Sequence, residues 1–165
     1  MTPIPSIPRP LDVQLANIKK NLFSDKWLLE PDSTEHTVAK FPTNGDRWAA
    51  SEIHKRGDTE GFQRKGFMAQ AIAAGWHHKS AAQLQQLADA VGRERIMVVH
   101  GTEDRMITFP HAGVLLEGLG GEEGGVTKHF EEEQGHVVPI EMREEFGQWV
   151  EELVEKAEKM NREGR

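Results

Sequence analysis

Asp104 and His136 are the residues of this chain whose types and spacing best suit proton-transfer chemistry. Asp104 follows the apolar, β-branched run at residues 96–99, so we expect it in a loop at the end of a buried strand. His136 lies in a loop containing Gly and Pro, residues 134–139, after a second strand-like run at residues 127–131. A carboxylate on the Nδ1 side of a histidine fixes its tautomer and stabilises the imidazolium, so the pair predicts a general base.

Both segments resemble the C-terminal part of an α/β-hydrolase of the AB hydrolase-1 type. The run Ile96-Met-Val-Val-His-Gly-Thr-Glu-Asp-Arg-Met-Ile107 is similar to the family's seventh strand, in which an apolar run leads through His-Gly to an acid. The dipeptide Gly135-His136, followed by Glu141, is similar to the family's histidine loop. The order of acid and histidine matches the second half of a Ser-Asp-His triad.

The resemblance implies an α/β fold class, as a C-terminal fragment of an α/β-hydrolase fold. Residues 1–92 would form a helical cap or lid with an extended, Pro-rich N-terminus, and residues 93–165 the C-terminal part of the core. In that core we expect two parallel strands, corresponding to the family's seventh and eighth, with flanking helices. The helix between the strands is expected to begin at Pro110, and the resemblance gives Asp104 and His136 the catalytic roles.

The nucleophile of such a triad is missing from the sequence. Serines occur at positions 6, 24, 33, 51 and 80, and none lies in a G-x-S-x-G elbow. The oxyanion-hole loop is missing as well, so we expect the chain alone to be inactive. The default chemistry is hydrolysis of an ester, thioester, lactone or amide by a serine. The lack of tyrosine argues against epoxide opening, while an aspartate nucleophile stays open as an alternative.

Other candidates for chemistry are weaker. Glu103 competes with Asp104 but comes one position too early, so we expect it to face solvent. The adjacent histidines His77 and His78 point in different directions on any regular element and have no third ligand at helical spacing. We therefore predict no metal site and no cofactor.

Four apolar residues are candidates for lining a substrate pocket: Met106, Ile107, Trp76 and Phe67. The first two follow the acid directly, and the aromatic pair belongs to the expected cap. In the intact enzyme they would favour a small apolar or acyl-type substrate.

Composition narrows the class of partner. The formal net charge of −7 makes a nucleic-acid partner improbable, because phosphate binding needs clustered Lys and Arg. The chain has no cysteine, which fits a reducing, cytoplasmic location, and it contains no apolar run of membrane-spanning length. Leu, Ile, Val and Phe make up about 22% of the residues, a low fraction that fits a cap plus an outer part of a core.

The expected elements leave one strand edge open. Helical spacing predicts helices over residues 11–22, around Trp48, after residues 57–59, between the Ser80 cap and Gly92, and near the C-terminus. The strand at residues 96–99 is apolar on both faces, as in a central strand, yet lacks neighbours on one side. We therefore expect self-association through that edge. The alternative function is a non-catalytic helical interaction module with a vestigial hydrolase core.

Overall fold

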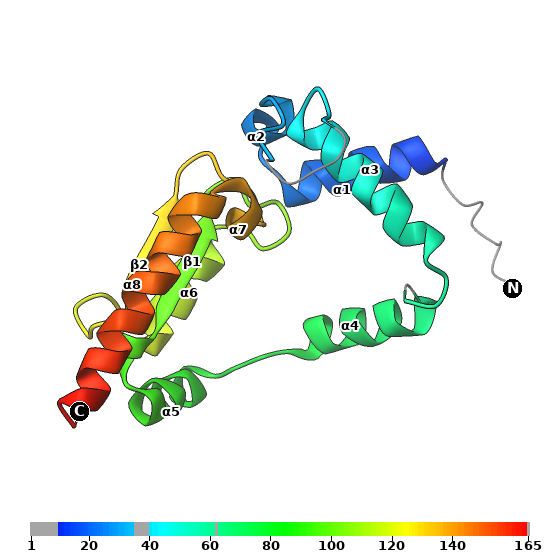
Figure 1. Ribbon diagram of the computed structural model, residues 1–165. Helices are drawn as coiled ribbons and strands as arrows, with labels where there is room; N and C mark the ends of the chain where they lie inside the picture. The colour runs from blue at the N-terminus through cyan, green and yellow to red at the C-terminus, as the bar shows by residue number, and fades with distance from the viewer. Residues whose placement is uncertain (1–9, 35–39, 62, 165) are drawn as a thin grey trace, which may run out of the picture.

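The computed structural model describes residues 10–34, 40–61 and 63–164 and shows a mixed α/β arrangement (Figure 1). Most of the Pro-rich segment at residues 1–10 lies outside the described residues. Three helices come first: α1 (Leu11–Leu22), α2 (Asp25–Leu29) and α3 (Asn44–Gly57). The short helix α2 was missed from the sequence. Its signal was Ser24, whose hydroxyl caps the helix by accepting from Trp27 N.

Aromatic side chains hold α1, α2 and α3 together. Phe23 and Trp27 are buried and stack with ring centroids 4.5 Å apart, and Trp48 of α3 meets Phe23 edge-on at 5.6 Å. Asp46 does not cap α3 as a sequence reading suggests. Thr43 is the N-cap, and its hydroxyl accepts from Asp46 N.

Helix α4 (Arg64–Trp76) stands apart from the other elements in Figure 1. All its residues from Lys65 to Trp76 are exposed, including Phe67 at 59% and Trp76 at 84%. The apolar side chains of this part of the expected cap are therefore not packed against the other described elements. Spacing predicted the helix correctly, but a partner surface for its apolar side chains is not among the described residues.

A small core forms where α5 (Ala81–Val91), the 3-10 turn η1 (Arg93–Arg95) and α6 (Pro110–Leu119) meet the sheet. Its buried members are Ala88, Val98, Leu116, Leu119 and Val126. Helix α5 thus packs on α6, although it falls within the 1–92 segment assigned to the cap. On α6, Ala112 and Leu116 are buried, whereas Val114 and Leu115 are exposed.

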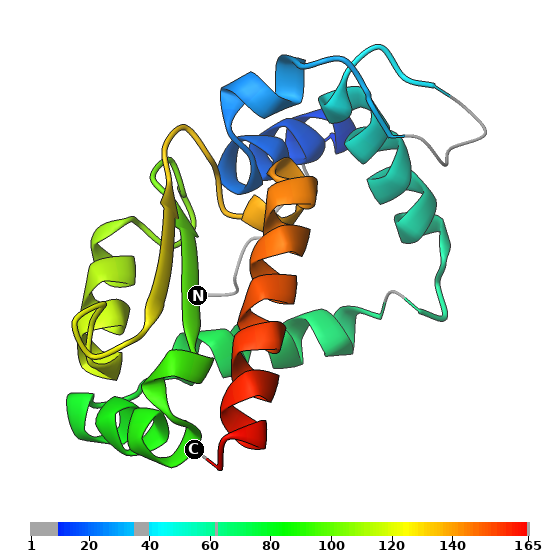
Figure 2. The same ribbon diagram turned by 60° about the vertical axis from the view of Figure 1, so that its left-hand side comes forward.

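The sheet has two parallel strands, β1 (Met97–Gly101) and β2 (Thr127–Glu131), in register from Met97 opposite Thr127 to Gly101 opposite Glu131. The parallel pairing and the intervening helix α6 confirm the predicted arrangement. Figures 1 and 2 show α6 and the long C-terminal helix α8 (Arg143–Arg162) on opposite faces of the sheet. The short helix α7 (Val138–Glu141) leads into α8.

Helix α8 lies against the sheet through one side of its apolar stripe. Phe146, Trp149 and Leu153 are half-buried, and the ring of Trp149 stacks on His129 of β2 at 4.0 Å. Val150 and Val154 of the same helix are exposed. Within the described residues, no helix combines the length and apolarity needed to cross a membrane.

Candidate functional site

Asp104 and His136 meet at the carboxyl edge of the two strands. Parallel neighbours end at the same edge of a sheet, so the loops after β1 and β2 come together there. Nδ1 of His136 lies 2.8 Å from Oδ2 of Asp104. The acid side chain is only 3% exposed, while that of His136 is 29% exposed. Donation from Nδ1–H to the carboxylate leaves Nε2 of His136 as the nitrogen available to take a proton.

Backbone donors fix the carboxylate on its other side. Oδ1 of Asp104 accepts from Met106 N and Ile107 N, both at 2.8 Å. The carboxylate thereby closes its own turn, and rotation about its last side-chain bond would break two hydrogen bonds. Met106 and Ile107 contribute to the site through their backbone amides, since both side chains are at least half exposed.

Gly101 allows the two loops to approach each other. A Cβ at this position would lie 2.3 Å from the carbonyl oxygens of Gln134 and Gly135. Glu103 N donates to Gln134 O at 2.9 Å in the same region. Position 101 therefore requires a residue without a side chain, because the histidine loop runs directly over Gly101.

The histidine loop is also held by the junction between α1 and α2. His136 N donates to Leu22 O at 2.8 Å. The carboxylate of Glu141 accepts from Ser24 N at 3.0 Å and from Gly135 N at 2.9 Å. Sequence reasoning noted Glu141 only as part of the family pattern and missed its role as a bridge between the two segments.

The acid loop is attached to the same junction. Arg105 donates to Lys20 O at 2.9 Å and pairs with the Asp25 carboxylate at 3.2 Å. The hydrogen bond and the charge of Arg105 lower the pKa of Asp25 below its usual value. One corner of the N-terminal helices, residues 20–25, thus holds both loops that carry the candidate dyad.

The competing acid and the paired histidines lie elsewhere. The half-exposed Glu103 carboxylate lies 3.8 Å from Arg105 and pairs with that arginine. His77 and His78 are exposed beyond the end of α4. Among the described residues, no group of three potential ligands is placed to hold a metal ion.

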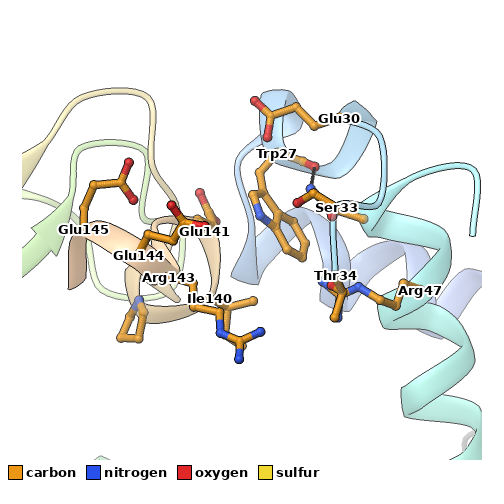
Figure 3. A pocket seen from close by; sticks show the side chains of 12 residues that line it. Trp27, Glu30, Ser33, Thr34, Arg47, Ile140, Glu141, Arg143, Glu144 and Glu145 are labelled. Carbon is orange, nitrogen blue, oxygen red and sulfur yellow. Dashed lines mark hydrogen bonds between the residues drawn. The ribbon is translucent and has the colours of Figure 1, made fainter. Parts of the chain in front are cut away.

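A cavity of about 710 Å³ lies beside the dyad's supports but does not include the dyad. Figure 3 shows Trp27, Ser33, Thr34 and Arg47 on one wall and Glu141, Glu144 and Glu145 on the other. The four predicted pocket residues do not line it: Met106, Ile107, Phe67 and Trp76 are all exposed side chains outside this cavity. Its mixed charges also differ from the apolar lining expected for an acyl group.

Two of the serines among the described residues are engaged as helix caps. The Ser24 hydroxyl is buried and engaged as a helix cap, and Ser80 caps α5 in the same way. No protein-family model, no curated protein and no solved structure matches this chain.

Proposed function

We propose that this chain is the acid- and base-bearing C-terminal portion of a serine hydrolase of the α/β-hydrolase type. The observation that carries the proposal is the 2.8 Å contact between Asp104 and His136 at the shared carboxyl edge of two parallel strands. A buried acid that orients a partly exposed imidazole is the arrangement a general base needs.

In this mechanism, Asp104 holds the proton on Nδ1 of His136, so that Nε2 takes the hydroxyl proton of an attacking serine. The imidazolium then returns that proton to the leaving group as the tetrahedral intermediate collapses. The serine and the oxyanion donors come from polypeptide outside the described residues. The substrate class is a small apolar or acyl-type ester, thioester, lactone or amide, and a cytoplasmic location stays a prediction from the lack of cysteine.

The test is to express this chain both alone and together with the coding sequence next to it, and to treat both products with a fluorophosphonate probe. We expect the probe to label a serine outside the 165 residues. The labelling should disappear in His136→Ala and persist in His54→Gln, a matched change of an exposed histidine on α3. Labelling of the isolated chain, or labelling of the longer product that is indifferent to His136, would contradict the proposal.

The alternative, a non-catalytic interaction module, is favoured by one feature, the exposed apolar residues of α4. Phe67, Met68 and Ile72 are about half exposed, and Trp76 almost fully so. A helix of this kind gains stability when its apolar side is covered by a partner. If no product encoded with this chain reacts with the probe, the interaction module becomes the better account.

A further inference from the structure

His100 lies against the same carboxylate oxygen of the candidate acid as His136 does. It lies on β1, and its side chain is 13% exposed. Its Nδ1 lies 2.8 Å from Gly101 O, and its Nε2 lies 3.4 Å from Oδ2 of Asp104. That Nε2 is the one buried side-chain nitrogen or oxygen, among the described residues, without a hydrogen-bond partner.

The acceptor capacity of Asp104 explains why this contact matters. An ionised carboxylate has about four lone-pair sites. Three of them accept at 2.8 Å, from Met106 N, Ile107 N and His136 Nδ1. Because the side chain is 3% exposed, water has little access to the fourth site. Nε2 of His100 lies 3.4 Å from Oδ2 and is placed to use it.

The direction of the His100 hydrogen bonds follows from its partners. A carbonyl oxygen only accepts, so Nδ1 of His100 carries the hydrogen shared with Gly101 O. Nε2 therefore donates to Asp104 in the doubly protonated ring, whereas the neutral ring would turn a lone pair towards the carboxylate. The groups facing this ring are Asp104, with His136 beyond it, and the uncharged Phe109, which in turn contacts Phe130 of β2.

We propose that His100 is a positioning residue that donates through Nε2–H to Oδ2 of Asp104 and so fixes the oxygen that orients His136. One carboxylate oxygen is then shared by two imidazoles, one on the strand and one on the loop. The catalytic meaning of this contact rests on the proposed hydrolase function, but the contact itself belongs to the isolated chain and can be measured there.

The experiment is imidazole NMR of the full 165-residue chain labelled with ¹⁵N-histidine. We expect solvent-protected signals from Nδ1–H of His136 and from Nε2–H of His100. His100→Leu should accelerate solvent exchange of the His136 proton by about tenfold or more, because the carboxylate loses a hydrogen-bond donor. His100→Gln, whose amide can donate in the same direction, should recover most of the protection, and His54→Gln should have no effect.

Two outcomes would overturn the proposal. One is a His136 signal that is equally protected in His100→Leu and the wild type, in a variant whose remaining spectrum shows the native fold. The second outcome applies if His100→Leu unfolds. A His100 Nε2–H signal that persists in Asp104→Asn would show that the carboxylate is not the acceptor of this hydrogen bond. A failed probe-labelling experiment changes neither signal, so the failure of the hydrolase function is distinguishable from the failure of this contact.

Discussion

At the scale of single residues, Asp104 gives nearly all its acceptor capacity to the protein. Its hydrogen bonds to two backbone amides and to His136 make it a rigid, buried anion. Burial of a carboxylate costs free energy unless such donors replace water, so the arrangement points to a use for the charge. Glu103, one residue earlier, has its recorded contact with Arg105 and takes no part in this network.

We predict that Asp104→Asn and His136→Ala lower the turnover of a short activated ester by about three to six orders of magnitude once the nucleophile-bearing part is present. Glu103→Gln should change it by less than about tenfold, because that carboxylate faces Arg105. Steady-state kinetics of the three variants checks the assignment. A larger effect at Glu103 than at Asp104 would place the acid one position earlier.

A second residue-scale prediction concerns Glu141. Glu141→Ala should lower the free energy of unfolding by about 2–4 kcal/mol, since the amides of Ser24 and Gly135 both lose a charged acceptor. Glu144→Ala, an exposed change on the next helix, should stay within about 0.5 kcal/mol. Urea unfolding measures both, and equal effects would show that the Glu141 bridge contributes little.

At the scale of elements, the site depends on close contact between loops that belong to different parts of the chain. The loop after β1 and the loop after β2 meet over Gly101, and both are hydrogen-bonded to the corner between α1 and α2. The supporting element is therefore helical, although the dyad itself comes from strand ends. Loss of that corner would leave the strands paired but both loops less constrained.

Gly101→Ala tests the contact between the loops. A Cβ 2.3 Å from two backbone carbonyl oxygens has no flexible side chain to displace, so the histidine loop itself has to move. We expect a loss of stability of about 1–3 kcal/mol and weakened protection of the His136 Nδ1 proton. Gly113→Ala on α6, where a Cβ would meet nothing within 4 Å, is the matched control. Unchanged protection in Gly101→Ala would contradict the steric account.

The N-terminal helices should respond to acid through Asp32. Burial alone would raise its pKa, but hydrogen bonds from Thr34 and Phe41, together with Arg47, outweigh burial and lower it. A lowered pKa in the folded state means that the stabilisation is complete above the ordinary value of 3.8 and is lost as the pH falls below it. Asp32→Asn should therefore flatten the fall in unfolding free energy between about pH 4 and pH 2. Urea melts at several pH values measure the slope, and parallel slopes would contradict the prediction.

At the scale of the whole molecule, an apolar helix and a strand edge are left uncovered. Helix α4 exposes its large side chains, and β1 has no strand on the edge opposite β2 among the described residues. A two-stranded sheet is marginal in water without further packing, and here helices cover its faces but leave the edge of β1 open. Both features favour association with further polypeptide.

We predict that the isolated chain associates in a concentration-dependent way through the free edge of β1. Along β1, every second residue directs its N–H towards β2, and the N–H of Val99 points to the free edge. Val99→Pro removes this donor and should weaken association. Trp76→Glu on α4 should leave it unchanged. Sedimentation velocity over a range of concentrations, with circular dichroism to confirm folding, separates the two surfaces. Association lost in Trp76→Glu alone would assign the contact to α4.

The sequence by itself determined the local elements and the order of the dyad. Capping residues such as Ser80 and Gly92 and the spacing of apolar residues depend on neighbours within a few positions, so both ends of α5 and the two strands were predictable, while the short helix α2 was missed. Two parallel strands, each ending in a polar loop, then placed Asp104 beside His136.

Tertiary structure alone decided the rest. The contact of His100 with Asp104, the bridge from Glu141 to Ser24 and the exposure of α4 depend on how whole elements pack. Glu141 and Ser24, for example, are 117 positions apart, and no local periodicity encodes such a distance. The spacing of apolar residues predicts that a helix has an apolar face, but packing between elements determines which surface covers it. For α4, the described residues do not provide such a surface.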